Sequence, residues 1–192
     1  MRNTIFFSFF MSIFKTTWVV LQTKKLSEKE FLYCVFFMEY GILWVKKQKK
    51  VREKPIDTGY LFHCEIITSN KTSIHIIWNI KVLWNYGIEN KSYHDIESFL
   101  KLLWKIKSEI PVWNPHSEIF HVLSVCISQN LNSWKILLMH LKVIAILWNL
   151  PDQNSDEVTE KTLKFIHKYS FKEILKLWEI PEDVKKKLEL ML

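Results

Sequence analysis

A short basic segment of the chain has the side chains needed to bind phosphate groups. Residues 46–54 hold six cations in nine positions, with one acid, Glu53, among them: Lys46, Lys47, Lys49, Lys50, Arg52 and Lys54. Such groups bind phosphates without reading the bases, so a dense group of them suits sequence-independent binding of nucleic acid. Lys24 and Lys25 form a second basic pair upstream, and we expect them to extend the same DNA-binding site.

The net charge of the chain is concentrated in its first quarter. Residues 1–54 contain 11 Lys and Arg but 4 Asp and Glu, which accounts for the whole formal charge of +7. Residues 55–192 contain 16 of each sign. A local excess of positive charge attracts a polyanion, such as nucleic acid, an anionic membrane or an acidic protein tail. A solvated lysine loop with no partner is the alternative that stays open.

The sequence carries no motif that is typical of an enzyme. The phosphate-binding P-loop, the G-x-S-x-G nucleophile turn and the H-E-x-x-H zinc motif are all absent. Asp152, Asp156 and Glu157 form an acidic group, but they precede a predicted helix, where interaction with the helix dipole explains them. We therefore expect a protein that is not an enzyme and needs no cofactor.

The cysteines and histidines do not suggest a disulfide framework or a metal site. Cys34, Cys64 and Cys126 lie far apart and are odd in number, which favours a reducing compartment such as the cytoplasm. His116 and His121 are five residues apart, so a helix would place them on different faces. We predict no zinc site.

Residues 1–14 form an apolar N-terminal extension ahead of the predicted barrel. Their apolar run, Ile5 to Phe14, is too short to span a bilayer as a helix. It resembles the core of a signal peptide, but no small-x-small cleavage site follows it. Translation starting at Met11 is the simpler explanation, and membrane attachment through residues 1–14 stays open as an alternative.

The first half of the chain has the pattern of a small β-barrel. Its apolar stretches are short and rich in β-branched and aromatic residues, which predicts strands separated by tight turns. The predicted strands are Thr17–Thr23, Phe31–Glu39, Ile42–Lys47, Gly59–Thr68 and Thr72–Leu83. Five strands with one long basic loop between the third and the fourth fit a barrel domain over residues 15–88.

From Ser92 onward the apolar period is that of helices, so residues 92–192 are predicted to form a helical domain. Ser92 with Asp95, and Ser170 with Glu173, have the spacing of helix-capping boxes. Pro115 and Pro181 suit first helical positions. The predicted apolar face of the first helix consists of Ile96, Phe99, Leu100, Leu103 and Ile106. Residues 133–148 are almost all apolar, which predicts a buried central helix. The fold class is therefore α+β.

Glycine is scarce in this chain and tryptophan is abundant. The chain has 3 Gly and 9 Trp, whereas an average composition would give roughly 13 Gly. Four tryptophans precede asparagine, and Gly-Asn would be a natural turn pair there: Trp78, Trp84, Trp113 and Trp148. One hypothesis is that the organism reads UGA codons as glycine, so that these positions are glycine in the cell. An AT-rich genome with real core tryptophans is the other, and the codons decide between them.

The order of these segments resembles the RecO family of bacterial recombination mediators. The resemblance begins with a strand, a polar turn and a hairpin at Leu21, Thr23, Glu28 and Gly41, and continues through the basic loop into the strand of residues 60–66. Later, residues 141–152 resemble the family's long helix ending in Leu-Gly-aromatic-x-Pro, with Trp148 at the place of that glycine. The similarity covers about residues 15–192 and rests on the ordered series, since no single motif is strongly specific.

Two features depart from the family pattern. Many relatives carry a cysteine-rich zinc module after the proline that corresponds to Pro151, and here only residues 152–155 separate this proline from the next predicted helix. The family's Lys-Gly-Ala-Arg loop core is replaced by residues 47–50, and its Pro-Phe after the loop by Thr58 and Gly59. The chain therefore resembles a reduced form of the family that lacks the zinc module.

The resemblance implies an OB-fold barrel followed by a helical domain, and a non-enzymatic role. Family members bind single- and double-stranded DNA, anneal complementary strands and help to load recombinase with RecR. OB-fold faces often stack bases on aromatic rings; Tyr60 and Phe62 are candidates, with barrel packing the preferred role for Phe62.

The alternative function is an adaptor that binds an acidic peptide. The resemblance implies a pocket in the helical half for the acidic tail of single-stranded-DNA-binding protein. Lys135 and Lys142, seven residues apart on one predicted helix, are candidate flanking residues for that pocket. Neutralising the basic loop would abolish DNA binding but would leave an adaptor working.

Overall fold

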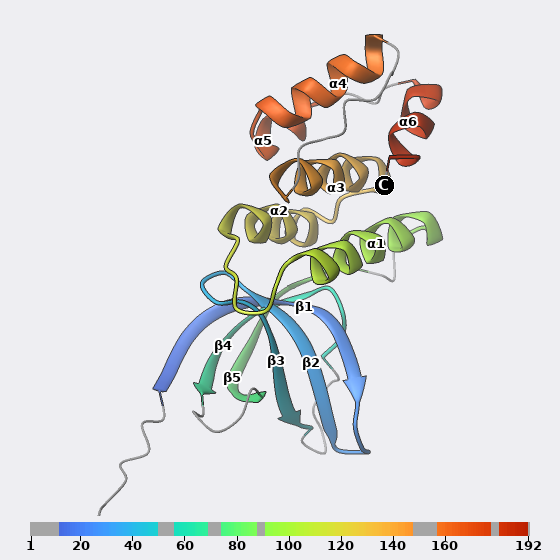
Figure 1. Ribbon diagram of the computed structural model, residues 1–192. Coiled ribbons are helices and arrows are strands. Elements are labelled where there is room, and N and C mark those ends of the chain that lie inside the picture. The colour runs from blue at the N-terminus through green and yellow to red at the C-terminus, as the bar shows by residue number, and fades with distance from the viewer. Residues whose placement is uncertain are drawn as a thin grey trace, which may run out of the picture.

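The computed structural model describes residues 12–49, 56–68, 74–87, 91–147, 157–177 and 181–191. Five strands come first: β1 (Ser12–Lys25), β2 (Glu30–Phe37), β3 (Gly41–Gln48), β4 (Tyr60–Thr68) and β5 (Ile74–Asn85). The helices follow: α1 (Tyr93–Glu109), α2 (Ser117–Ser128), α3 (Ser133–Leu147), α4 (Glu157–Lys168), α5 (Phe171–Ile174) and α6 (Glu182–Glu189) (Figure 1). The predicted α+β class, with strands before helices, is confirmed.

The five strands pair in the order β1-β2-β3-β5-β4, and β4 pairs again with β1, which closes a barrel. All pairings are antiparallel except the short parallel one between β3 and β5. β1 is long enough to pair with two strands: with β4 from Ser12 to Val19 and with β2 from Trp18 to Lys25. Its register with β2 shifts between Val20 and Gln22, and a bulge of this kind lets a strand bend sharply from one neighbour to the next.

β2 shows why this part of the chain is so apolar, because both of its faces are covered near its end. Val35 and Phe37 point into the barrel, whereas Cys34 and Phe36 point outward against the helices. The barrel interior contains Trp18, Val20, Tyr33, Val35, Phe37, Leu43, Val45, Ile56, Phe62, Cys64, Ile66 and Ile77. Trp18 stacks on Phe62 with their ring centroids 4.8 Å apart, so large aromatic rings fill this interior.

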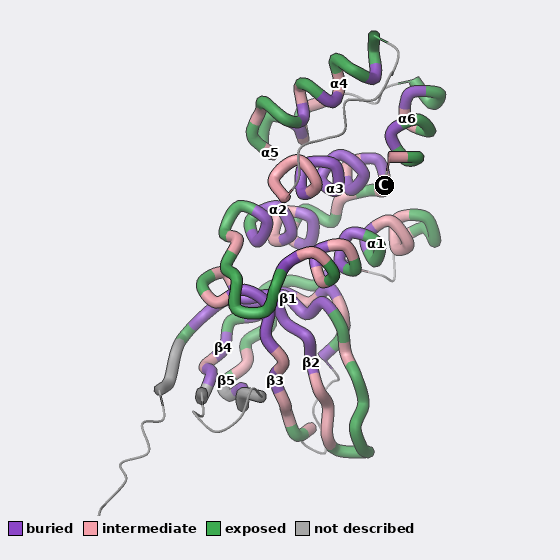
Figure 2. Tube along the Cα trace, in the orientation of Figure 1, coloured by how far each residue is buried: buried purple, intermediate pink, exposed green. Residues whose placement is uncertain are grey.

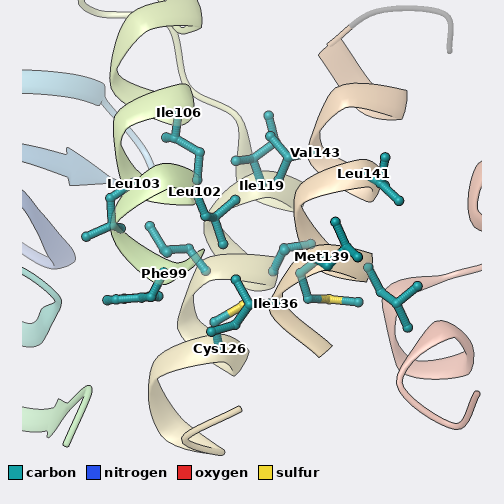
Figure 3. Close-up of a cluster of buried hydrophobic side chains, with 14 of the residues drawn as sticks. Phe99, Leu102, Leu103, Ile106, Ile119, Cys126, Ile136, Met139, Leu141 and Val143 are labelled. Atoms are coloured by element: carbon teal, nitrogen blue, oxygen red, sulfur yellow. The ribbon is translucent and has the colours of Figure 1, made fainter. Parts of the chain in front are cut away.

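The helices cover one end of the barrel and share a continuous hydrophobic core with it (Figure 1). Phe36 of β2 meets Phe120 of α2 edge to face, with ring centroids 5.7 Å apart. Side chains of α1, α2 and α3 converge in this core, as Phe99, Cys126 and Met139 show in Figure 3. The boundary between the predicted barrel domain (15–88) and the predicted helical domain (92–192) therefore separates strands from helices in sequence, while apolar packing crosses it.

Two of the three glycines occupy positions that a larger residue would strain. Gly41 has a φ of +74°, and a Cβ there would lie 2.4 Å from the backbone oxygen of Asn114. Gly59 has a φ of +80°, and a Cβ there would lie 2.7 Å from the ring of Phe99. At both positions the absence of a side chain lets the barrel backbone approach the helical half closely, at the Asn114 backbone for Gly41 and at the Phe99 ring for Gly59.

The predicted elements agree with the structure except at a few positions. Both predicted capping boxes are present, and α3 is the buried central helix. β1 begins at Ser12 rather than at Thr17. Leu100 was predicted to face the core but is exposed, because Leu102 takes the buried position on α1. α2 begins at Ser117, two residues after the predicted Pro115.

Over the described ranges, no helix combines the length and the apolar character needed to cross a membrane.

Candidate nucleic-acid interface

The ends of β1, β2 and β3 bring the basic residues together at the end of the barrel that lies away from the helices (Figure 1). β2 lies between β1 and β3, so its first residues have a lysine on either side. Phe31 is opposite Lys25 and Lys47, and Leu32 is opposite Lys24 and Lys46. We call this group of residues 24–25, 29–32 and 46–49 the basic rim. Two basic segments that are 21 residues apart in sequence thus become one surface.

The two faces of the rim carry different side chains. Residues directly opposite each other in antiparallel strands point to the same side of the sheet. On the outer side, Lys46 Nζ lies 2.8 Å from Glu30 Oε1. Hydrogen bonds from Lys46 and from Gln48 lower the pKa of the Glu30 carboxyl, so this acid stays ionised and offsets part of the positive charge. On the inner side, Phe31 lies between Lys25 and Lys47, which are directly opposite it on the two neighbouring strands.

Lys29 belongs to the rim although its sequence position did not single it out. It lies in the turn between β1 and β2, and its carbonyl oxygen accepts the backbone N–H of Lys49 at 2.7 Å. This bond brings the turn to the end of β3. A lysine in a polar turn carries no signal by itself, and only the pairing of the strands places it beside the basic segment.

The predicted DNA-binding residues are partly within the described ranges. Lys24 and Lys25 are exposed, whereas Lys46, Lys47 and Lys49 are partly buried. Figure 2 shows the corresponding strand ends, that of β1 largely exposed and that of β3 largely of intermediate burial. Lys50, Arg52 and Lys54 lie outside the described residues, so their contribution stays a prediction.

The two predicted stacking residues are not on the rim. Phe62 is completely buried in the barrel, which confirms the packing role preferred for it. Tyr60 begins β4, next to Leu61, which is paired with Val19 in the middle of β1. It stacks on Phe62 with a centroid distance of 5.6 Å, so its ring extends the interior stack.

The two lysines predicted to flank a peptide pocket make contacts inside the helical half. Lys135 Nζ donates to the carbonyl oxygens of Leu175 and Leu177, at 2.6 and 2.5 Å. Lys142 is only 7% exposed, and its Nζ lies 3.4 Å from the carbonyl oxygen of His167. Neither is the exposed helix lysine that sequence alone would suggest. Both join α3 to the segments packed on it, and a role in peptide binding stays a prediction.

A groove of about 500 Å³ lies where the barrel meets α2 and α5. It is lined by Leu61, Trp84, His121, Ser124, Val125, Ser128, Phe171 and Lys172. Trp84 is 56% exposed, so an aromatic ring is accessible beside it. This is a mainly apolar groove with an ammonium and an imidazole group among its lining residues.

The buried thiols are unreactive and unpaired with one another. Cys34, Cys64 and Cys126 are free and buried. Burial raises the pKa of Cys34 to about 11 and of Cys64 to about 12, so both remain thiols at neutral pH. Among the described residues, no three His, Cys, Asp or Glu side chains gather in a way that could hold a metal ion.

No protein-family model matches the chain, and no curated protein matches it either.

Proposed function

We propose that this chain is a DNA-binding recombination mediator of the RecO kind, with an OB-fold barrel that binds single- and double-stranded DNA without sequence preference. In this proposal it anneals complementary strands and assists recombinase loading together with RecR. Its proposed place of action is the cytoplasm, and its role is not enzymatic.

The observation that carries the proposal is the convergence of lysines at the basic rim. The strand register places Lys24 and Lys25 of β1 at the same level as Lys46 and Lys47 of β3, with only β2 between them. Adjacent strands are about 4.8 Å apart, so the two lysine pairs are separated by about 10 Å. A duplex or a single strand presents phosphates at intervals that long lysine side chains can reach from such a surface.

The strand order supports the OB-fold assignment. An OB-fold is a five-stranded Greek-key barrel that binds oligonucleotides through one face and its loops. Here β1 pairs with both β2 and β4, and β3 pairs with β5 in parallel. The basic segment of residues 46–54 begins inside β3, so this strand itself carries Lys46 and Lys47.

A basic rim of this kind also suits annealing. Two complementary strands repel each other through their phosphates, and a dense group of ammonium groups screens that repulsion. Lysine contacts release counterions, so binding is expected to be tight at low salt and to weaken steeply as salt rises.

The test is fluorescence anisotropy of the full chain with labelled single- and double-stranded oligonucleotides over a salt series. The rim variant replaces Lys24, Lys25, Lys47 and Lys49 by Ala. We expect it to bind both oligonucleotides more weakly and to flatten the dependence of log K on log salt by up to about 3, because each phosphate contact contributes about 0.7–0.9.

A matched control removes the same amount of charge elsewhere. The variant with Ala at residues 161, 164, 168 and 186 neutralises four exposed lysines of α4 and α6. It should bind like the wild type. The proposal is wrong if neither oligonucleotide binds at low salt, or if the two variants weaken binding equally.

The groove beside α2 favours a second candidate function, that of a peptide adaptor. Its apolar lining with Lys172 and His121 suits the acidic, apolar tail of single-stranded-DNA-binding protein. A labelled peptide of that tail should bind the wild type and the rim variant equally and should lose affinity in Lys172→Glu. Peptide binding without oligonucleotide binding would make the adaptor the main function.

A further inference from the structure

Phe31 occupies an unusual place on the basic rim. It is the second residue of β2, and it is directly opposite Lys25 on one side and Lys47 on the other. Side chains that are directly opposite in antiparallel strands share a face, with Cβ atoms about 5 Å apart. An aromatic ring is therefore flanked by two ammonium-bearing side chains on the inner face of the rim.

The ring is held in place by its neighbours. Phe31 packs against the barrel interior and stacks on Tyr33, with ring centroids 6.1 Å apart and planes 20° from parallel. Phe31 is nevertheless only partly buried, whereas Tyr33 behind it is buried. A ring supported from one side and accessible from the other loses little conformational freedom when a flat ligand stacks on it.

The next residue along β2 provides an internal comparison. Leu32 is flanked by Lys24 and Lys46 in the same way, but on the outer face. It has no π-system, and Lys46 there is paired with Glu30. One strand thus presents an aromatic residue between two lysines on one face and an aliphatic residue between two lysines on the other.

We infer that Phe31 stacks an unpaired nucleobase while Lys25 and Lys47 hold the phosphates on either side of that nucleotide. This inference rests on the proposed function and specifies it further. Bases in a duplex are already stacked on each other and do not offer a free face, so Phe31 acts on single strands only. The lysines serve both forms of DNA, and the ring supplies the preference for the single-stranded form.

Phe31→Leu tests the inference, since it keeps an apolar side chain and removes the π-face. We expect single-strand affinity to fall at least about fivefold, in line with the effect of removing one stacking ring. Double-strand affinity and the salt dependence for both forms should stay as in the wild type, because no ammonium group is lost. Phe31→Tyr should retain single-strand affinity.

Leu32→Ala is the matched control, because it shortens the adjacent rim residue on the other face. It should leave both affinities unchanged. A loss of single-strand affinity as large as that of Phe31→Leu would show that any disturbance of the rim has this effect, and would overturn the inference.

A second measurement needs no variant. Wild-type protein is titrated with an intact single strand and with a strand of equal length and charge that carries abasic sites. We expect at least about fivefold weaker binding of the abasic strand, and equal binding would overturn the inference. The rim variant distinguishes failure of this inference from failure of the proposed function. If the rim variant binds both oligonucleotides as tightly as the wild type, the proposed function is wrong. If the rim variant binds more weakly but the abasic strand binds as tightly as the intact strand, only the role of Phe31 is wrong.

Discussion

The backbone N–H of Trp113 donates to the carbonyl oxygen of Ile42 at 3.3 Å, and Trp113 makes this bond with a φ of +66°. A bulky residue in the left-handed region is a conformational outlier, and glycine is the residue that adopts it without strain. The side chain of Trp113 is 51% exposed. This position is therefore one where the structure supports the hypothesis of a UGA codon read as glycine.

Trp113→Gly is expected to stabilise the protein. Relief of the left-handed conformation contributes about 1–3 kcal/mol, and the greater freedom of glycine in the unfolded chain takes back about 0.5–1 kcal/mol. A net gain of about 1 kcal/mol corresponds to an increase of about 2–4 °C in melting temperature. Thermal unfolding followed by circular dichroism measures it.

Trp104→Gly is the control for this experiment. Trp104 is also exposed, at 67%, but lies inside α1, where glycine lowers helix stability by about 1 kcal/mol. The two substitutions should therefore shift the melting temperature in opposite directions. A fall with Trp113→Gly would mean that the indole ring contributes more than the backbone strain costs. The codons of the gene, or the mass of the natural protein, then decide the identity of the residue itself.

Gly41→Ala should destabilise the protein by at least about 2 kcal/mol, because the left-handed backbone and the close approach act together. The new Cβ would meet the Asn114 backbone at 2.4 Å, and backbone atoms cannot rotate away as a flexible side chain can. Gly87→Ala is the comparison, since the nearest atom to its Cβ would be 3.8 Å away. Urea unfolding should show a much larger loss at residue 41 than at residue 87, and equal losses would contradict the geometry.

Lys135→Met should lower the free energy of unfolding by about 1–2 kcal/mol. The substitution keeps the length of the side chain but removes the ammonium group that donates to Leu175 and Leu177, and hydrogen bonds to a charged group contribute about 1.5–3 kcal/mol when well shielded. Partial burial lowers the pKa of Lys135, which offsets some of this stabilisation. Lys176→Met, at an exposed position, should have almost no effect in the same urea titration. If Lys135→Met is as stable as the wild type, the hydrogen bonds of Lys135 do not stabilise the fold, and the predicted role in peptide binding becomes the better explanation for this lysine.

His140 should make the protein less stable in mild acid. Its imidazole is buried on α3, and burial, with Lys105 and Lys101 nearby, lowers its pKa from 6.5 to about 4. Above pH 6.5 the imidazole is neutral in both the folded and the unfolded state and contributes no pH dependence. Between pH 6.5 and about 4 the unfolded chain takes up a proton that the folded chain does not, so stability falls by up to about 3 kcal/mol.

The variant His140→Leu isolates this effect. Urea unfolding at a series of pH values from 7 to 4 should show a steeper loss for the wild type than for the variant, and the difference between the two curves belongs to residue 140. Parallel curves would show that the pKa of this imidazole is the same in the folded and the unfolded chain.

Much of the local structure follows from short-range patterns in the sequence. Ser92 with Asp95 and Ser170 with Glu173 form their capping boxes within four residues, so no distant contact is needed to start those helices. The strands of the first half likewise follow from alternation and β-branched residues, and the long apolar segment is the buried α3. The composition also concentrates positive charge before residue 55 whatever the fold.

Only the tertiary structure decided which of these residues meet. Strand register places Phe31 between Lys25 and Lys47, and a shift of one residue would put Leu32 there instead. Packing of α3 turned Lys135 from an expected surface residue into a donor to Leu175, because that carbonyl comes from a segment 40 residues away. Periodicity predicts which side chains share a face of one helix or strand. Which residues of another helix or strand they contact depends on long-range pairing that no local pattern encodes.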